Sequence, residues 1–226
     1  MHALIINGSP RVKQFSNTDK ILEKFTAGLR ECGCSVEVYE ISVRNDWEKI
    51  REAFKENDNI IIALPLYVEC VPGLLMEFLE GLAPKDENTR LSFILQSGFA
   101  EGAQLRCGEN YLRLLARQLG CKYGGTLVKG DNFGIRFVEG KERDKITEPY
   151  RKMGQIFARN GDFFSDECRK FTGLEIFPLP LRLCLKLMFK TIQRKNFQKV
   201  AAKWGCTKPL DYKPYKENDF KAPGFG

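Results

Sequence analysis

Short apolar runs alternate with amphipathic segments over most of this chain. We expect five strands, at residues 3–7, 35–41, 60–64, 91–97 and 123–129. The runs 3–6 and 60–64 have the continuous apolar character of strands that are buried on both faces of a parallel sheet. Apolar residues recur at helical spacing over 18–32, 46–57, 73–82 and 104–119, and a longer helix is expected over 148–171 with an interruption at Gly161.

This alternation of strands and helices predicts right-handed βαβ units and a parallel sheet. Five strands with five helices fit an α/β fold of the flavodoxin-like, doubly wound kind, with strand order 2-1-3-4-5. That topology places the ligand crevice at the carboxyl ends of strands 1 and 3, where the winding reverses. We also expect Val36 and Val38 of the second strand to face the core, and Asp46 to cap the second helix.

The loop that follows the first strand, residues 8–17, carries the features of an anion site. Gly8 allows a sharp turn, Ser9 and Ser16 supply hydroxyls, and Arg11 supplies a planar cation. Residues 16–19, Ser-Asn-Thr-Asp, have the form of a capping box that opens a helix. Backbone amides, helix dipole, hydroxyls and guanidinium would then converge on one pocket. An ordinary strand-to-helix turn with a solvated arginine is the alternative.

The spacing in this loop narrows the choice of phosphate ligand. No Lys-Ser or Lys-Thr follows a second glycine, so the loop is not a Walker A motif, and no GxGxxG marks a dinucleotide site. No cysteine lies between Gly8 and Asn17, which excludes a phosphatase that uses a thiolate in this loop. A long, hydroxyl-rich loop suits a terminal phosphomonoester, and FMN is the ligand that we favour.

Two further loops fall at the same predicted edge of the sheet. The segment 65–72 offers apolar and aromatic surface to a flat heterocycle, and its amides can donate to the pyrimidine edge of a flavin. A third loop, 96–99, could bound the ring or the nicotinamide site. From these two loops we expect cofactor contacts from Pro65, Leu66, Tyr67, Val68, Gln96, Ser97 and Gly98. A buried hydrophobic turn and a plain turn are the alternatives, and Asp131 and Asn132 after the fifth strand are weaker candidates.

The composition excludes several classes of chemistry. The 226 residues include one histidine, His2, so Ser-His-Asp and Cys-His hydrolases and multi-histidine metal centres are excluded. The eight cysteines form no CxxC pair, so we expect reduced thiols in a cytoplasmic protein and no iron–sulfur or zinc site. No run approaches the length of a membrane span, and the N-terminus lacks the form of a signal peptide. An enzyme of this composition must use carboxylates or lysines or leave the hard chemistry to a cofactor. Hydride transfer through a flavin is the second case, and we expect no catalytic side chain.

Positive charge is concentrated at the C-terminal end. Residues 182–226 hold eleven Lys and Arg against three acidic residues, a charge of +8, so residues 1–181 sum to −1. No nucleic-acid-binding module accompanies these basic residues. Basic residues recur every fourth position at Arg182, Lys186, Lys190 and Arg194, beside an apolar stripe of Leu181, Leu185, Met188 and Ile192. This pattern predicts a basic amphipathic helix.

Three partners are open for this helix. We favour packing on the body of the protein or on a second subunit, over contact with a membrane surface or with an acidic redox partner. The tail after Trp204, with Pro209, Pro214 and Pro223, is expected to be extended and to embrace another subunit.

Three segments together carry a family resemblance. GSPRVKQFSNT (8–18), PLYVECVPGLLMEFLEGL (65–82) and LQSGFAEG (95–102) resemble the NAD(P)H-dependent FMN reductase and multimeric flavodoxin superfamily, over about residues 1–170. The resemblance implies a flavodoxin-like fold, non-covalent FMN, and reduction of flavin, quinone or similar small-molecule acceptors by NAD(P)H in a homodimer or homotetramer. It implies that the phosphate is held by Ser9, Arg11, Ser16, Asn17 and Thr18, and the isoalloxazine by Pro65 to Val68. The chain lacks the compact cysteine cluster of the iron–sulfur branch.

We therefore expect an FMN-binding domain over 1–171 and a basic helical extension with an extended tail over 172–226. The expected function is an FMN-dependent NAD(P)H oxidoreductase. The alternatives are a flavodoxin-type electron carrier and a non-catalytic FMN or nucleotide sensor. Carriers of that type rely on an acidic surface, which a body of charge −1 with a +8 extension does not provide.

Overall fold

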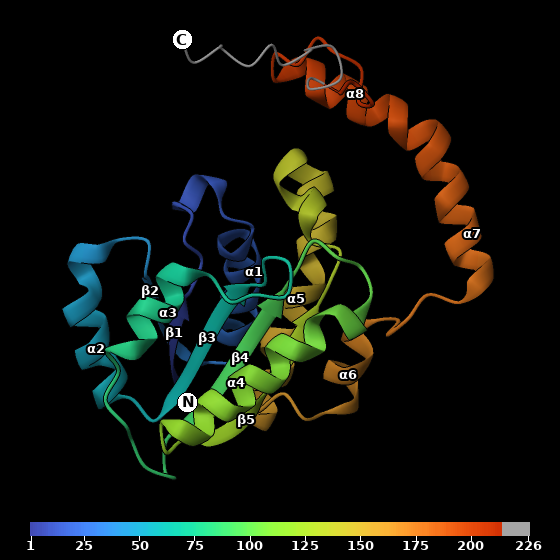
Figure 1. The fold of residues 1–226 in the computed structure, drawn as a ribbon. Helices are drawn as coiled ribbons and strands as arrows, with labels where there is room; N and C mark the ends of the chain where they lie inside the picture. Colours follow the sequence, from blue (N-terminus) through green and yellow to red (C-terminus); the bar gives the residue numbers. More distant parts are fainter. Residues whose placement is uncertain (214–226) are drawn as a thin grey trace, which may run out of the picture. The chain divides into compact units, whose positions relative to one another are not determined.

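A computed structural model describes residues 1–213 and contains one five-stranded parallel sheet (Figure 1). The strand order is β2-β1-β3-β4-β5, which confirms the predicted topology. The strands are β1 (His2–Asn7), β2 (Ser35–Glu40), β3 (Asn59–Pro65), β4 (Arg90–Gln96) and β5 (Lys122–Lys129). The helices are α1 (Asn17–Glu31), α2 (Trp47–Glu56), α3 (Gly73–Glu80), α4 (Arg106–Gln118), α5 (Gly140–Asn160), α6 (Asp166–Thr172), α7 (Leu179–Met188) and α8 (Arg194–Lys203).

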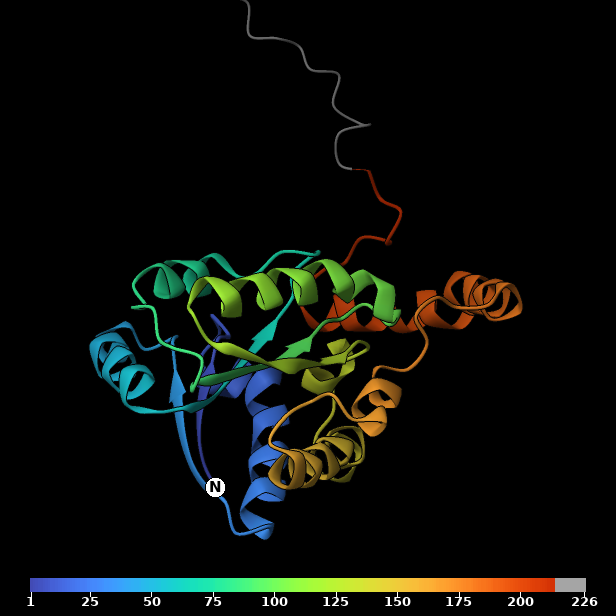
Figure 2. The same cartoon turned by 90° about the horizontal axis from the view of Figure 1, so that it is seen from below.

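Alternate residues of the inner strands point to opposite faces of the sheet and build two separate cores. On β1, for example, Leu4 and Ile6 pack with α2, α3 and α4, whereas Ala3 and Ile5 pack with α1 and α5. Figure 2 shows the two helical layers on either side of the sheet. Because β1, β3 and β4 are covered on both faces, their apolar runs are continuous, as the sequence predicted.

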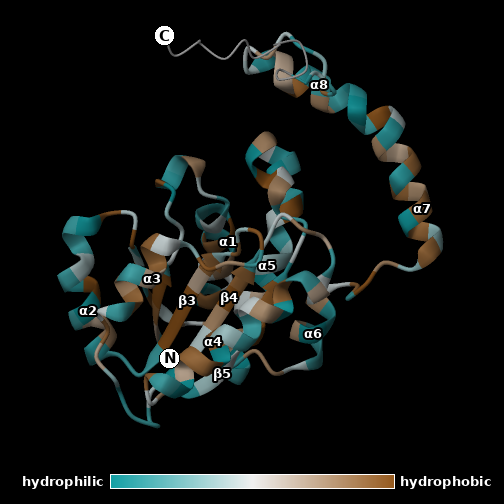
Figure 3. Ribbon diagram, in the orientation of Figure 1, coloured by the Kyte–Doolittle hydropathy of each residue, from teal (hydrophilic) through white to brown (hydrophobic). Residues whose placement is uncertain are grey.

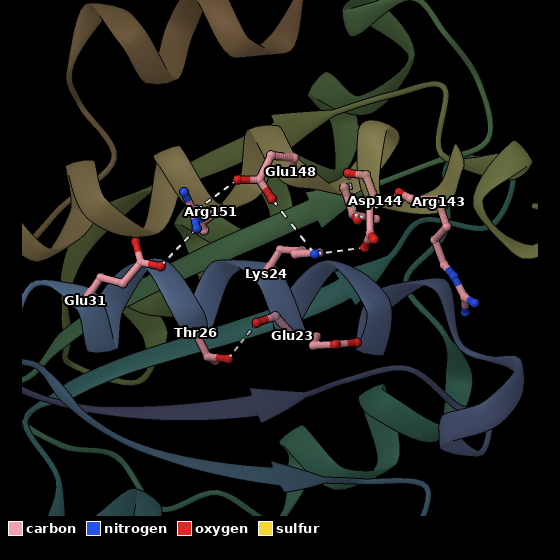
Figure 4. A network of polar contacts seen from close by, with 9 residues as sticks. Glu23, Lys24, Thr26, Glu31, Arg143, Asp144, Glu148 and Arg151 are labelled. Carbon is pink, nitrogen blue, oxygen red and sulfur yellow. Dashed lines mark hydrogen bonds and ion pairs between the residues drawn. The ribbon is translucent and has the colours of Figure 1, made fainter. Parts of the chain in front are cut away.

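Helices α1 and α5 approach each other closely through two glycines. A Cβ atom on Gly28 would lie 2.0 Å from the carbonyl oxygen of Arg151, and one on Gly154 would lie 2.1 Å from that of Phe25. A polar network closes over this contact, in which Lys24 of α1 lies 2.8 Å from Asp144 and 3.9 Å from Glu148 of α5 (Figure 4). This packing of α1 against α5 holds the N-terminus of α1 at the edge of the sheet.

Three local predictions are wrong. Helix α5 begins at Gly140 rather than at 148, because Ile146 is the only apolar residue in its first eight positions and the periodic signal starts after Pro149. Val38 is 40 % exposed, since β2 is an edge strand with a neighbour on one side only. Asp46 precedes α2 but makes no capping hydrogen bond, because a 3₁₀ turn runs into the helix and gives Asp46 helical dihedrals. The expected interruption at Gly161 is confirmed by its φ of 73°.

The chain divides into two compact units, Met1–Ile176 and a second unit from Phe177 onward. The expected division after Phe171 falls within α6. The predicted C-terminal helix is present as α7, a π-helical turn over Phe189–Gln193, and α8. Pro214 and Pro223 of the expected extended tail lie outside the described residues. Within residues 1–213, no helix has both the length and the apolar character needed to cross a bilayer.

Candidate functional site

A cavity of about 190 Å³ opens at the carboxyl ends of the central strands. It is formed by the loops after β1, β3, β4 and β5, so it occupies the switch point that the topology assigns to a ligand. Its lining consists of Ser9, Arg11, Asn17, Thr18, Pro65, Leu66, Tyr67, Gln96, Ser97, Gly98, Phe133 and Arg136. Ten of these residues were predicted from the sequence. Two predicted residues, Ser16 and Val68, do not line the cavity, and Phe133 and Arg136 were not predicted.

The loop after β1 turns sharply because Gly8 sits against the neighbouring strand and helix. Its amide donates to the carbonyl oxygen of Ala63 at 2.7 Å, and a Cβ atom at this position would lie 2.7 Å from the side chain of Leu75. The Ser9 amide then donates to the side-chain oxygen of Asn7 at 3.0 Å, and the Arg11 amide donates to the Ser9 hydroxyl at 3.3 Å. These bonds fix the backbone that presents Arg11 to the cavity.

Ser16 acts on the start of α1 rather than on the cavity. It is fully buried, and its hydroxyl accepts from the amide of Asp19 at 3.2 Å, which confirms the predicted N-cap. The second half of a capping box is absent, because the Asp19 carboxylate instead accepts from Asn7 at 2.8 Å. Lys20 donates to the carbonyl oxygens of Gln14 at 3.0 Å and Ser16 at 3.1 Å, which ties the loop to the first turn of the helix.

Asn17 joins the first loop to the loop after β5. Its side-chain nitrogen donates to the carbonyl oxygen of Asn132 at 2.8 Å, which fixes the orientation of the amide. The side-chain oxygen is left buried without a hydrogen-bond partner in the structure. Asn17 therefore presents an acceptor at the cavity for a donor on a ligand, such as a hydroxyl.

The loop after β3 contains a strained hairpin turn. The amide of Tyr67 donates to the carbonyl of Cys70 at 2.9 Å, and the amide of Cys70 donates back at 3.1 Å. The two central residues, Val68 and Glu69, have φ values of 49° and 68°. Such a turn is normally made by Asn-Gly, and a β-branched residue there is an outlier. Val68 is 75 % exposed at the tip of this turn, outside the cavity lining.

Strain of this kind persists where the surrounding structure holds it in place, often at ligand clamps. The turn lies beside Pro65, Leu66 and Tyr67, which form an apolar wall of the cavity. Leu66 is anchored by its amide, which donates to the carbonyl of Gln96 at 2.7 Å.

The loops after β4 and β5 are joined through Asn132. Its amide donates to the carbonyl of Ser97 at 2.9 Å, and its side chain donates to the hydroxyl of Tyr150 at 2.9 Å. At the same end of the sheet, Gln96 donates to the Thr18 hydroxyl at 3.4 Å. Burial is the main cause that raises the pKa of Tyr150, so this phenol stays neutral in its link to Asn132.

Arg136 and Phe133 stand on one 3₁₀ turn, Phe133–Phe137, directly after this loop. The guanidinium carbon of Arg136 lies 4.6 Å from the ring centres of both Phe133 and Phe137. Burial, followed by the charge of Arg11, lowers the pKa of Arg136 from its ordinary value. The polar pair Asp131-Asn132 after the fifth strand was the signal that could have directed attention to this turn.

The electrostatic character of the cavity is that of an anion site. Arg11 and Arg136 both face it, the N-terminus of α1 points toward it, and no carboxylate occurs among the residues that line it. The side-chain donors beside them are hydroxyls and amides, from Ser9, Thr18 and Gln96 among others. This donor set suits a phosphate with its three oxygens.

The remaining lining suits the rest of an FMN molecule. The buried acceptor of Asn17 matches a ribityl hydroxyl, and the apolar wall of Pro65, Leu66 and Tyr67 matches a flat ring system. The enclosed volume of about 190 Å³ is below the ~300–1,000 Å³ of typical ligand pockets. The cavity thus encloses part of such a ligand, and the ring would extend toward the exposed side chains at the mouth.

Residues 1–122, more than half of the chain, match the family described as NADPH-dependent FMN reductase. The chain belongs to this family. Membership identifies the protein as a flavin-dependent oxidoreductase that uses FMN and NAD(P)H and acts on small-molecule substrates, in agreement with the cofactors expected from the sequence. The matched segment contains all the predicted cofactor contacts, and Phe133 and Arg136 lie beyond it.

Solved structures similar to this member of the NADPH-dependent FMN reductase family have the same fold. An NAD(P)H:quinone oxidoreductase from Methanothermobacter marburgensis is 19% identical, with a TM-score of 0.52 over 71% of this chain and 96% of that chain. The general stress protein 14 from Treponema denticola, in complex with FMN, is 12% identical, with a TM-score of 0.52 over 70% and 98%. The azoreductase AzrA is 13% identical, with a TM-score of 0.51 over 70% and 99%. No curated protein sequence matches the chain.

Proposed function

We propose that this protein is an FMN-dependent NAD(P)H oxidoreductase that passes electrons to a quinone, a flavin or a similar aromatic acceptor. The observation that carries the proposal is one cavity, at the switch point of the sheet, that combines two guanidiniums with an apolar wall. FMN, when bound, accepts a hydride from the nicotinamide and passes two electrons to the acceptor. The protein binds and orients both.

Each side of the cavity has its own task in this proposal. Ser9, Arg11 and Thr18 hold the phosphate, and Asn17 orients the ligand through its free acceptor. Ser16 acts indirectly, by capping the helix whose amides face the phosphate. The ring contacts come from Pro65, Leu66, Tyr67, Gln96, Ser97 and Gly98, whereas Val68 lies outside the lining. None of the lining residues is a carboxylic acid, lysine, histidine or cysteine, which supports proton transfer from solvent.

The side chains at the mouth favour a flat aromatic acceptor. Tyr67 and Phe133 line the cavity and are 40 and 44 % exposed, and Phe137 packs against Phe133 with the ring centres 5.0 Å apart. The names of the similar structures, an azoreductase and a quinone oxidoreductase, support the same class of acceptor.

The same exposed residues support a homodimer or homotetramer. Phe15 and Val68, in the loops after β1 and β3, are 61 and 75 % exposed, and a second copy that covered them would remove this apolar surface from water. None of the eight cysteines is paired, which supports a location in the reducing cytoplasm.

Anaerobic titration of the purified, FMN-loaded protein with NADPH and with NADH tests the proposal. Rapid loss of the flavin absorbance, followed by its return on addition of a benzoquinone, is the expected result. A carrier would be reduced by another protein but not directly by NAD(P)H. A sensor would turn over slowly with every acceptor, and either outcome would replace the proposal.

A further inference from the structure

The second unit exposes an unusual amount of apolar surface on one long helical segment. Leu179, Leu183 and Leu187 are 58 to 66 % exposed, and Ile192 is 63 % exposed. No residue of α7, of the π-helical turn or of α8 is buried. Figure 3 shows hydrophobic residues along most of α7. Exposure on this scale marks a surface that binds something.

Helix α7 is apolar around most of its circumference. Leucine occupies every second position from 179 to 187, and residues two apart lie about 200° apart on a helix, so these leucines cover opposite sides. Arg182 and Lys186 are its only charged residues. A helix of this kind is stable only where its surface is covered by apolar material.

The π-helical turn Phe189–Gln193 brings the apolar residues of α7 and α8 into one stripe. Its extra residue delays the following turns by about 100°, the rotation of one helical residue. Phe197, Val200 and Trp204 then lie in line with Leu181, Leu185 and Met188. In an uninterrupted α-helix the first three residues would lie about 100° away from that line. Thr191 supports the turn by donating to the carbonyl of Leu187 at 2.9 Å.

Positive charge lies off this stripe, on the side of the helix that also carries Leu179, Leu183 and Leu187. Residues 177–213 carry nine Lys and Arg and one acidic residue, Asp211, which lies 3.0 Å from Arg194. The same helical projection places Arg182, Lys186, Lys190, Arg194, Lys195, Lys199 and Lys203 off the apolar stripe.

We propose that this segment, Leu179 to Trp204, binds the surface of an anionic membrane, with its apolar stripe inserted and its lysines and arginines among the lipid headgroups. Such a surface supplies apolar depth and negative charge together. A second copy of the segment would bring another +8, and residues 1–176, with a net charge of −1, attract it little. Charge therefore decides between these occupants.

Vesicle binding by the full-length protein tests this proposal. We expect co-sedimentation with phosphatidylcholine vesicles that contain phosphatidylglycerol, at least tenfold weaker binding to pure phosphatidylcholine, and loss of binding in high salt. Trp204 is 68 % exposed and Trp47 is 8 % exposed, so a blue shift of tryptophan fluorescence on binding reports the segment. Equal binding to both vesicles, or no binding, overturns the proposal.

Matched variants test separately whether vesicle binding depends on the basic residues and on the apolar stripe of this segment. Lys186→Glu with Lys190→Glu should weaken binding at least tenfold, whereas Lys152→Glu on α5 should not. Leu185→Asp should also weaken vesicle binding at least tenfold, whereas Leu114→Asp, at a 56 % exposed position of α4, should leave binding unchanged. If the wild-type protein does not bind vesicles and Leu185→Asp instead lowers the oligomeric state in light scattering, the apolar stripe is covered by a second copy of the chain and the proposal is wrong.

The π-helical turn provides a test at constant charge. An alanine inserted after Lys195 rotates Phe197 and Trp204 about 100° off the stripe and should weaken vesicle binding. Deletion of Thr191 removes the extra residue without changing the alignment and should preserve binding. Equal binding by both variants would contradict the stripe. None of these measurements needs NADPH or bound FMN, so they are independent of the proposed reaction.

Discussion

Asn17 donates a hydrogen bond of 2.8 Å to the backbone carbonyl of Asn132, 115 residues further along the chain. This bond joins the end of the loop after β1 to the loop after β5, at the edge of the sheet where the cavity opens. It also turns the side-chain oxygen of Asn17 into a buried acceptor without a partner. The same residue thus closes the site and leaves one polar group for the ligand.

Asn17→Ala should weaken FMN binding by about 0.5–1.5 kcal/mol, the contribution of a neutral hydrogen bond. Fluorescence titration of the apoprotein with FMN measures the change. Asn88→Ala, at an exposed asparagine in the loop before β4, is the control and should bind FMN as wild type does. An unchanged dissociation constant for Asn17→Ala would show that its oxygen does not meet the ligand.

Arg11→Ala should cost more, about 1.5–3 kcal/mol, because a charge-assisted hydrogen bond to the phosphate is lost. The loss should be much smaller for riboflavin, which has no phosphate. Lys13→Ala is the matched control, since Lys13 belongs to the same loop, is 80 % exposed and does not line the cavity. Equal losses for FMN and riboflavin would remove Arg11 from the phosphate site.

Glu69→Gly should raise the free energy of unfolding of the apoprotein by about 1 kcal/mol. Glycine adopts the φ of 68° at this position without the steric cost that a glutamate incurs. Thermal unfolding followed by circular dichroism measures the effect. Glu87→Gly, in a loop where the backbone φ is negative, should give no gain, and a gain there as large as at 69 would refute the strain.

Gly28→Ala and Gly154→Ala should each destabilise the protein by about 1–3 kcal/mol or more, because the new methyl group meets the backbone of the facing helix. Gly73→Ala at the start of α3 is the control, since nothing lies within 4 Å of the added Cβ atom. Chemical denaturation compares the three. A neutral Gly28→Ala would mean that α1 and α5 can separate without cost.

Glu40, the last residue of β2, makes the free energy of unfolding of the protein depend on pH. Burial, followed by the charge of Asp19, raises the pKa of Glu40 from its ordinary value of 4.5, and the nearby Lys13 opposes the shift. A raised pKa means that the folded state prefers the protonated Glu40 carboxyl. The contribution of this carboxyl to the free energy of unfolding is therefore largest below pH 4.5, and it is lost as the pH rises through the pKa of the folded state.

Glu40→Gln cannot ionise and should therefore be more stable than wild type at pH 7, with the difference vanishing toward pH 4. Urea unfolding at the two pH values measures this. Glu87→Gln, at an exposed glutamate, should show no such pH-dependent gain. A gain for Glu40→Gln that is the same at both pH values would assign it to packing instead.

The sheet and much of the cavity could be predicted because both depend on patterns that the sequence carries locally. The apolar runs of β1, β3 and β4 are continuous since both faces are covered, and the order of strands then follows from the βαβ rules. Gly8, Ser9 and Arg11 follow the end of a strand directly, and at that place their residue types indicate an anion site. Their roles toward FMN remain predictions.

What the sequence did not indicate depends on packing between distant segments. Arg136 lines the cavity only because a 3₁₀ turn after β5 carries it back over the site. Ser16 has the chemistry of a phosphate ligand, but the cap it provides to α1 uses its hydroxyl. Val68 is carried away from the cavity lining by a turn that its residue type disfavours.

One measurement tests the central claim most directly: the absorbance spectrum of the purified protein under anaerobic conditions, before and after NADPH. We predict the two flavin bands of non-covalent FMN, their loss on addition of NADPH, and their return with a quinone. A protein that takes up no FMN, or one whose bound FMN stays oxidised in excess NADPH and NADH, would contradict the account.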